Sequence, residues 1–311
     1  MTLRPNLRQQ GVAVITALLL TTLAITIVAS LFWQQQVQVR SIENQRLQLQ
    51  KQWILRGAVD YARLILTAAD RTPNSDSLDD PWAVPLAETR LDDYVENGRA
   101  DTDVPDAVLS GGIEDAQGRF NLKNLTQADA TKQQTELLAF GRLLSALQLN
   151  PSLAQATMAF IASTQNKEIE GIKNPGQQVL ELNQADDLLA IPAITPEVLD
   201  KLKPFVIVLP EVTALNVQTA PAEVLYARIA TLTLADAREI VSKRRNMSFS
   251  TVSDFGVRMQ IRDTLGSDAT LGTKYFLVHG KVRLNRAGME MQALIHRPAP
   301  GRSSVIWIRE F

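Results

Sequence analysis

The sequence contains no cysteine, only two histidines among its 311 residues, and a formal net charge of −1. Without cysteine there is no disulfide, no catalytic thiol and no thiolate metal ligand. Two histidines are too few for a multi-histidine metal centre, and near-neutral charge disfavours a surface that binds nucleic acid through its phosphates. The sequence also has no G-x-S-x-G, P-loop, G-x-G-x-x-G or H-E-x-x-H motif. These absences favour a protein that is not an enzyme.

What the sequence does contain is a long uncharged run near its start, from Val12 to Trp33. As a helix, this run is roughly 33 Å long, enough to cross the bilayer core of about 30 Å. The preceding flank carries Arg4 and Arg8 and no acid, so the positive-inside rule predicts that this end stays in the cytoplasm. Residues 34–311 are then exported.

Three interpretations of this run compete: a buried core helix, a cleaved secretory signal and a retained membrane anchor. A secretory signal has an apolar region of about 7–15 residues that ends at an A-x-A-like site. The run here is longer and ends in Leu31-Phe32-Trp33, and its two aromatic residues suit the membrane interface. A single-span anchor is therefore favoured.

The helix is predicted to continue beyond the membrane. Residues 34–69 contain no proline, and Gly57 is their only glycine. Apolar residues recur at close to helical spacing, which predicts one helix of about 55 residues whose second half is amphipathic and covered by a soluble domain. The predicted stripe consists of Leu47, Ile54, Ala58, Tyr61, Ala62 and Ile65.

A basic leader, a glycine at Gly11 and a long apolar helix together resemble the type IV pilin and pseudopilin family. In that family a prepilin peptidase cuts after this glycine at the cytoplasmic face of the membrane. The resemblance implies cleavage after Gly11 and an N-methylated mature N-terminus at Val12. A glycine that flanks an anchor by chance remains an alternative.

One departure from the family pattern is informative. Most members carry Glu at the fifth mature position, where this chain has Thr16. A carboxylate in lipid is costly without a partner, and the family's Glu is thought to pair with the terminal amine of the subunit ahead. A subunit with nothing ahead lacks that amine, and Thr16 can bond to carbonyls of its own helix instead. In lacking this Glu, the chain resembles the minor pseudopilins at the tip of the type II secretion pseudopilus, the general secretion pathway protein K family.

The segment from Gly111 to Leu125 is similar to a stretch of that family, I-x-D-x-Q-G-R-F-N-L-x-N-L. Short strands at Ile113–Asp115 and Arg119–Leu122 around Gln117-Gly118 predict a hairpin. The preceding residues, 70–106, are rich in acids and prolines and predict a solvated connection. The resemblance implies that the hairpin leads from a pilin-type strand into an inserted helical domain.

From Leu125 to about Phe255 the pattern is helical. Two stretches are similar at an offset of 38 residues, and each has a threonine, Thr195 or Thr233, where an N-cap is expected. This predicts a helix–hairpin–helix duplication of two SAM-like units. The predicted helices are Asp129–Leu147, Pro151–Thr164, Ala185–Ala190, Pro196–Lys203, Pro221–Ile229 and Leu234–Arg244.

Helix–hairpin–helix units often bind DNA phosphates through a glycine-containing hairpin, but neither predicted hairpin contains glycine. The nearby basic residues are interpreted as a solvated helix end rather than a phosphate contact: Arg238, Lys243, Arg244 and Arg245. The family's helical domain can also hold calcium. Here Ala162 and Thr164 replace carboxylate positions, and only Glu168 and Glu170 remain close by, so no metal site is predicted.

The C-terminal part changes to a period of two residues, which predicts strands at Tyr275–Leu284, Met289–Arg297 and Ser304–Glu310. The two histidines, His279 and His296, fall in these strands as surface or packed residues. An antiparallel meander with one apolar face suits packing against the long helix.

The predicted fold class is α+β: a pilin-like fold, with a long N-terminal helix packed on an antiparallel sheet, and a large inserted α-helical domain. Its parts are a leader at 1–11, a membrane half of the helix at 12–33, the exported half with the first part of the pilin-like domain at 34–121, the helical insertion at 122–265 and the last strands at 266–311.

The resemblance implies a minor pseudopilin at the tip of the type II secretion pseudopilus, which nucleates its assembly and supports export of folded proteins across the outer membrane. The implied partners are other minor pseudopilins, the major pseudopilin, prepilin peptidase and the inner membrane, with no cofactor and no nucleic acid. The implied location is single-pass in the inner membrane, with the bulk of the chain periplasmic. Two alternatives remain: an anchored periplasmic DNA-binding protein of the competence type, and a minor pilin of a type IV pilus.

Overall fold

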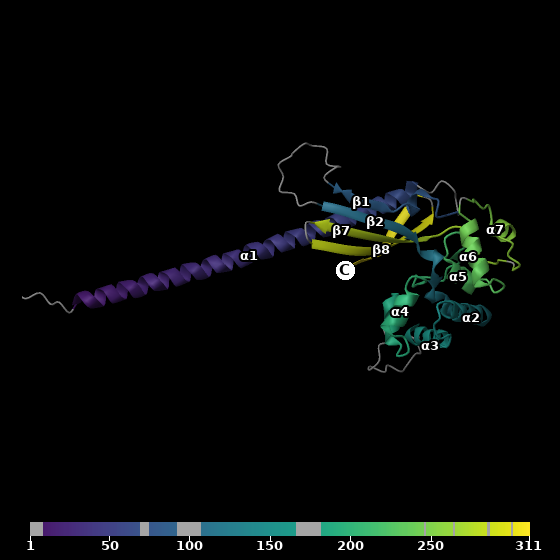
Figure 1. The fold of residues 1–311 in the computed structure, drawn as a ribbon, viewed down its shortest axis with the longest axis horizontal. Helices are drawn as coiled ribbons and strands as arrows, with labels where there is room; N and C mark the ends of the chain where they lie inside the picture. The colour runs from purple at the N-terminus through teal and green to yellow at the C-terminus, as the bar shows by residue number, and fades with distance from the viewer. Residues whose placement is uncertain are drawn as a thin grey trace, which may run out of the picture. The chain divides into compact units, whose positions relative to one another are not determined.

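The computed structural model describes residues 9–68, 75–91, 107–165, 182–245, 247–263, 265–284, 287–299 and 301–311. The chain divides into two compact units, Met1–Ile54 and Leu55–Phe311. All described residues of the first unit lie in helix α1 (Gln9–Ala68), whose final turns belong to the second unit (Figure 1). The prediction of one long helix is confirmed.

The apolar part of α1 is exposed throughout. Every residue from Val12 to Trp33 is exposed to solvent, and the helix is long and apolar enough to cross a membrane by length and composition. The run is therefore not a core helix within the described part of the chain.

The second unit contains, among its described residues, a five-stranded sheet of order β1-β2-β7-β8-β9. Each neighbouring pair is antiparallel. The three predicted C-terminal strands are confirmed as β7, β8 and β9. The strands are β1 (Leu86–Arg90), β2 (Ala107–Asp115), β7 (Tyr275–Leu284), β8 (Ala287–Ala299) and β9 (Arg302–Glu310).

Strand β1 corrects one prediction, because it lies within the segment that was interpreted as a solvated connection. It follows a short 3-10 turn, η1 (Pro81–Ala83), that buries Trp82 against Phe276 of β7 with ring centroids 5.3 Å apart. The strand pairs Leu86 with Gly111 of β2. Its sequence has no clear apolar alternation, so it is specified by backbone pairing rather than by a pattern that sequence analysis can detect.

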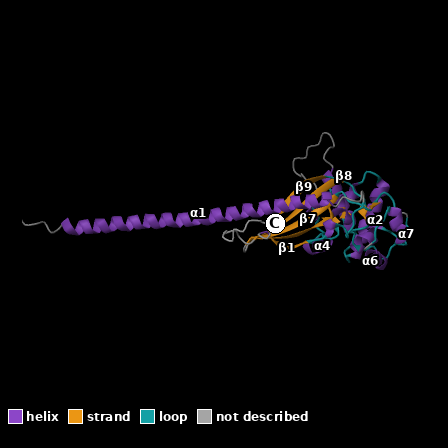
Figure 2. Ribbon diagram, turned by 90° about the horizontal axis from the view of Figure 1, so that it is seen from above, coloured by secondary structure: helices purple, strands orange, loops and turns teal. Residues whose placement is uncertain are grey.

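One face of the sheet packs on the last turns of α1, as Figure 2 shows. The buried residues on this part of the helix are Leu55, Val59, Ala62 and Leu66, spaced four, three and four positions apart. The predicted stripe shares only Ala62 with this set, and Tyr61 is exposed. The stripe was placed one position early because Ile54, Ala58 and Ile65 flank the true face and are equally apolar. The helix lies close to Gly280 of β7, where a Cβ would lie 3.1 Å from the Met291 side chain and 3.3 Å from the Leu55 side chain.

The helical region lies between β2 and β7, which are neighbours in the sheet, so it is an insertion into the sheet's connectivity. Its core includes Phe120, Phe140 and Phe255. The predicted N-caps are confirmed, because Thr195 accepts from Val198 N and Thr233 from Asp236 N. The helices are α2 (Ala130–Ala146), α3 (Leu153–Gln165), η5 (Ala185–Ala190), α4 (Pro196–Leu202), α5 (Ala222–Arg228), α6 (Leu234–Lys243) and α7 (Val252–Arg258).

The predicted hairpin around Gln117 is wrong. After β2 the chain forms a 3-10 turn, η3 (Ala116–Gly118), whose start is fixed by the Asp115 carboxylate accepting from Gln117 N. The next strand, β3 (Phe120–Asn121), pairs in parallel with β4 (Val206–Ile207) rather than with β2. The turn residues direct the chain away from the sheet, into the helical region. Two further short strands, β5 (Leu215–Asn216) and β6 (Ala269–Thr270), also pair in parallel.

Candidate assembly helix and the junction beneath the helical region

The four threonine hydroxyls of the apolar run bond to carbonyls of the same helix. Thr16 Oγ1 donates to the carbonyls of Val12 and Ala13, both at 3.0 Å. Thr21, Thr22 and Thr26 make the same kind of bond to carbonyls three or four residues earlier. Hydroxyl groups that bond within their own helix suit a bilayer, which offers them no water. The prediction that Thr16 bonds back to its own helix is confirmed.

Helix α1 begins at Gln9, so both residues of the predicted cleavage site, Gly11 and Val12, lie within it. The predicted processing after Gly11 stays a prediction. What the geometry establishes is that the fifth position after Gly11 carries a neutral side chain whose hydrogen bonds stay inside its own helix.

A buried polar junction joins the sheet to the helical region. At the end of β2, the Asp115 carboxylate accepts from Gln117 N at 2.7 Å, Asn216 Nδ2 at 2.7 Å and Thr219 Oγ1 at 2.6 Å. Burial raises the pKa of Asp115 to about 6, and the hydrogen bonds from Thr219, Thr273, Gln117 and Asn216 oppose that rise. The carboxylate thus holds together segments that are about a hundred residues apart in the chain.

A second buried acid, Asp76, ties the same junction to α1. Arg297 Nη2 lies 2.5 Å from Asp76 Oδ1, and both side chains are 7% exposed. Arg297 also donates to the carbonyl of Leu66 at 3.2 Å, while Asn216 Nδ2 donates to the Asp76 carbonyl at 3.0 Å. Burial raises the pKa of Asp76, although Thr273 N–H and Arg297 both favour its charged form. The prediction that the acids of this segment are solvated is wrong for Asp76.

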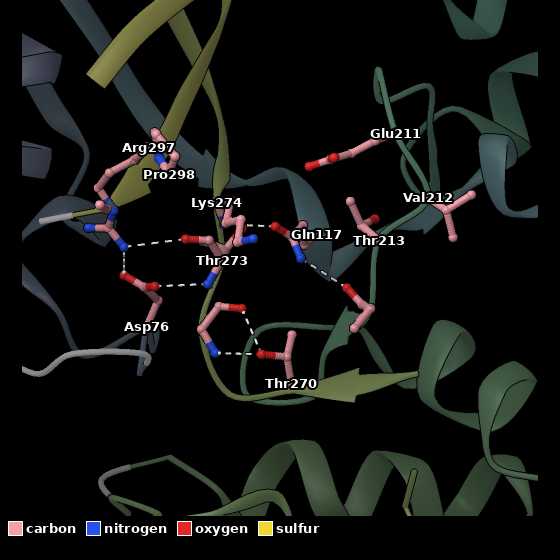
Figure 3. Close-up of a pocket in the computed structure, with 13 residues that line it drawn as sticks. Asp76, Gln117, Glu211, Val212, Thr213, Thr270, Thr273, Lys274, Arg297 and Pro298 are labelled. Carbon is pink, nitrogen blue, oxygen red and sulfur yellow. Dashed lines mark hydrogen bonds and ion pairs between the residues drawn. The ribbon is translucent and has the colours of Figure 1, made fainter. Parts of the chain in front are cut away.

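A cleft of about 390 Å³ opens beside the junction (Figure 3). Gln117 closes one wall, because its Nε2 donates to Ala214 O at 3.0 Å and its Oε1 accepts from Lys274 N at 2.7 Å. Glu211 accepts from the Tyr275 hydroxyl at 2.9 Å, and burial and this carboxylate raise the pKa of Tyr275. Gln117, Glu211 and Tyr275 therefore connect the loop before β5 to the start of β7, so their role is structural.

The polar face of β7 carries His279, whose predicted place in a strand is confirmed. His279 Nε2 lies 3.5 Å from Glu114 Oε2, and Arg119 pairs with the same carboxylate. Interaction with His279 and then Arg119 lowers the pKa of Glu114 to about 2, against the effect of burial. His296, also in a strand as predicted, stacks on Tyr275 with centroids 4.7 Å apart. Neither histidine is placed as part of a catalytic pair in the described residues.

The second hairpin of the helical region bears on the DNA-binding alternative. The Thr231 N–H and hydroxyl donate to Asp263 Oδ2 at 3.1 and 3.0 Å. An acidic side chain of the protein therefore occupies the position that an anion would take. Arg142 donates to the carbonyls of Ala230 and Ile229 at 2.7 and 3.0 Å, so it stabilises the hairpin from the other side.

The basic cluster beyond this hairpin is not a solvated helix end as a whole. Arg244 is buried and donates to the carbonyl of Val217 at 2.7 Å. Burial lowers its pKa to about 10. Arg238, Lys243 and Arg245 are exposed, as expected. With Arg244 turned inward and Asp263 at the hairpin, the geometry argues against phosphate binding.

No group of three or more histidine and acidic side chains that could hold a metal occurs among the described residues. Ala162 lies exposed on α3. Glu168 and Glu170 lie outside the described residues. The stretch compared with the family's calcium ligands thus supplies no carboxylate within α3.

The residues of the buried junction are not indicated by the sequence. Asp115 lies in the stretch that resembles the family, but a motif match does not indicate which of its residues meet others in space. Asp76 and Arg297 are separated by more than two hundred positions. The available signal was the presence of charged residues beside otherwise apolar segments, which alone does not predict pairing.

Comparison with known proteins identifies the family. Two family models, both described as type II secretion system (T2SS) protein K, match residues 118–211 and 215–273. The type II secretion system protein K of Pseudomonas aeruginosa is 29% identical over 326 residues, covering 96% of this chain and 92% of that protein. A chain in the crystal structure of the GspK-GspI-GspJ complex from the enterotoxigenic Escherichia coli type 2 secretion system has the same fold. Its TM-score is 0.68 at 20% identity, over 88% of this chain and 99% of that one. The chain belongs to the type II secretion system protein K family, the minor pseudopilins that its sequence motifs resemble.

Proposed function

We propose that this protein is the tip subunit of the type II secretion pseudopilus and that it nucleates pseudopilus assembly. The observation that carries the proposal is the neutral fifth position of the apolar helix. The Thr16 side chain is uncharged, and its hydroxyl donates to the carbonyls of Val12 and Ala13, so it needs no other hydrogen-bond partner in lipid. It needs no charged partner from a subunit ahead, as a tip subunit requires.

In this proposal α1 anchors the chain in the inner membrane with its N-terminus in the cytoplasm. Prepilin peptidase removes residues 1–11, and Val12 becomes the methylated N-terminus. The support is the apolar length of the helix, the basic flank of Arg4 and Arg8 and the position of Gly11 at the edge of the run. The rest of the chain lies in the periplasm.

The helical region between β2 and β7 gives the tip its shape. It comprises about residues 122–265 and is organised as two SAM-like units, an organisation supported by the similarity of its halves and by the matching N-caps Thr195 and Thr233. A region of this size at the end of the sheet leaves no room for a further subunit above it. That steric limit makes the protein the first subunit rather than an internal one.

The partners are the other minor pseudopilins, followed by the major pseudopilin. The related E. coli structure is of a complex that contains GspI and GspJ, and we assign equivalent partners here. Contacts in the membrane use the small and hydroxyl residues that allow close helix approach: Ala13, Thr16, Ala17, Thr21, Thr22, Ala24 and Thr26. Outside the membrane, α1 exposes Tyr61 and Leu64, whose exposed fractions are 54% and 63%.

The experiment is a charge substitution at Thr16 in the full chain. Thr16→Glu introduces a carboxylate without a partner, which is costly in lipid. We expect secretion to fall at least tenfold when this variant is the only copy. Thr16→Val, of similar shape and without charge, should secrete normally. Normal secretion by Thr16→Glu would overturn the tip assignment.

A further inference from the structure

The two edges of the sheet are protected to different degrees. Edge strand β1 is five residues long, follows Pro85, and carries Glu88 and Arg90. These features protect an edge against pairing with another strand. Edge strand β9 is nine residues long and has no proline, and its charged residues, Arg302, Arg309 and Glu310, lie at its two ends. Its Ile306 and Ile308 are each 40% exposed.

The backbone of β9 directs hydrogen-bonding groups outward. Phe311 exchanges both backbone hydrogen bonds with Glu290, at 2.8 and 3.2 Å. Pairs in an antiparallel ladder alternate between hydrogen-bonded and non-hydrogen-bonded. Ile308, opposite Ala293, therefore falls in a non-hydrogen-bonded pair. Its N–H and C=O point away from β8, and among the described residues no strand pairs with β9 on that side.

Both ends of this strand already contact other segments, which bounds the open part. Near its C-terminal end, Arg309 donates to the carbonyl of Asn183 at 3.1 Å. Arg63 of α1 donates to the carbonyl of Ser303 at 3.0 Å and to its hydroxyl at 3.3 Å. The open part therefore starts at Ser304. It includes the irregularity of the ladder near Val305 and the two exposed isoleucines.

A groove of about 470 Å³ adjoins the same end of β9. Its walls come from α1, with Asp60, Arg63, Leu64 and Thr67, and from the start of β9, with exposed Arg302. The groove shares Leu64 with the surface of α1 that the proposed function assigns to assembly. An extended segment paired with β9 would thus continue directly from that surface.

We propose that the edge of β9 from Ser304 to Ile308 is an interaction surface that takes an extended strand of another pseudopilin. Backbone hydrogen bonds to Ile308 supply affinity, and apolar side chains on the incoming strand cover Ile306 and Ile308. An acidic residue of that strand faces Arg302. This inference rests on the proposed function, because it takes the partner to be a pseudopilin.

The first test is photo-cross-linking in the full chain, produced in a membrane with the other pseudopilins. A photoreactive residue replaces Ile308 of β9, Tyr61 of α1 or Ala87 of β1 in turn. We expect cross-links to a pseudopilin from positions 308 and 61, and none from position 87. Cross-links from 61 without 308 would overturn the strand pairing and leave the proposed function standing. If neither position 61 nor position 308 gives a cross-link, both the strand pairing and the proposed function are contradicted. A cross-link from position 308 to a protein that is not a pseudopilin would overturn the assigned partner.

The second test separates backbone pairing from side-chain contact. Ile308→Pro removes the outward N–H without removing a bond to β8, whereas Ile308→Val keeps it. We expect Ile308→Pro to weaken co-isolation of the partner by about tenfold and Ile308→Val by less than about twofold. Thermal unfolding of both variants checks the fold. If Ile308→Pro does not fold, hydrogen exchange of the Ile308 amide decides. It should slow at least about tenfold in the unaltered complex, and an unchanged rate would overturn the pairing.

Discussion

The two ends of α1 differ in where the hydrogen bonds of their polar groups go. Near the N-terminus, threonine hydroxyls bond to carbonyls of their own helix, and no contact with the rest of the chain is needed. Near the C-terminus, the helix contributes the Leu66 carbonyl to Arg297, a residue more than two hundred positions away. The first arrangement leaves the surface of the helix exposed from Val12 to Trp33. The second anchors the helix to a folded domain, so substitutions should have very different effects at the two ends.

The largest effect is expected at Arg297. Arg297→Ala leaves the Asp76 carboxylate buried without its cation, which costs about 3–5 kcal/mol of unfolding free energy. Arg302→Ala, on exposed Arg302 of β9, is the matched control and should change stability by less than about 0.5 kcal/mol. Denaturant unfolding of the full chain in detergent measures both. Equal, small effects would mean that the Asp76–Arg297 pair does not stabilise the junction.

The two sides of α1 should differ almost as strongly. Leu66 is fully buried, and Leu66→Ala should cost about 2–5 kcal/mol. Leu64, two positions earlier and 63% exposed, should tolerate the same change within about 0.5 kcal/mol. Similar losses in both variants would contradict the assigned buried face. A loss of partner binding in Leu64→Ala, at unchanged stability, would sharpen the proposed use of the exposed side.

Asp115 should make stability depend on pH. Its pKa is raised from its ordinary value of 3.8 to about 6 in the folded protein, so between these values the folded state holds a proton that the unfolded state has lost. The stabilisation is fully present below pH 3.8 and is lost as pH rises through about 6. For a shift of this size it amounts to about 3 kcal/mol. Asp76 acts with the same sign.

Glu114 has the opposite sign, and its window lies at lower pH, overlapping that of Asp115 only between about 3.8 and 4.5. Its pKa is lowered to about 2 from 4.5, so its contribution is lost only as pH falls below about 4.5. Melting temperatures between pH 4.5 and 7 therefore isolate the buried acids. Asp115→Asn should flatten the slope in this range, and an unchanged slope would rule out Asp115 as its source.

A smaller effect is expected at a helix cap. Thr233 caps α6 and forms a capping box with Asp236, in which each side chain accepts from the backbone N–H of the other residue. Thr233→Ala should cost about 1 kcal/mol, and Thr233→Ser should cost little because it keeps the oxygen. A loss in the serine variant as large as in the alanine variant would mean that the cap contributes nothing.

Much of this architecture follows from local patterns. Period-two alternation located β7, β8 and β9, and threonine before a helical pattern located two N-caps. The errors have physical causes. The buried stripe of α1 was misplaced because apolar residues lie on both sides of the true face, and β1 was missed because its strand depends on backbone pairing. The hairpin at Gln117 was wrong because the Asp115 carboxylate fixes a 3-10 turn there.

The junction could not be predicted for a different reason. Asp115 meets Asn216 and Thr219, and Asp76 meets Arg297, only after the helical region has been inserted between β2 and β7. A buried acid looks like any other acid in sequence until its partners are known. Thr16 is the contrary case, because its hydrogen bonds are local and helical spacing alone predicts them.

The most direct test of the central claim is co-isolation of the full chain with the other minor pseudopilins from detergent-solubilised membranes. The account predicts a defined complex that contains one copy of this protein, and that still forms when the major pseudopilin is absent. A chain that is recovered alone, with every minor pseudopilin present in the same membrane, would contradict the claim that it begins the pseudopilus.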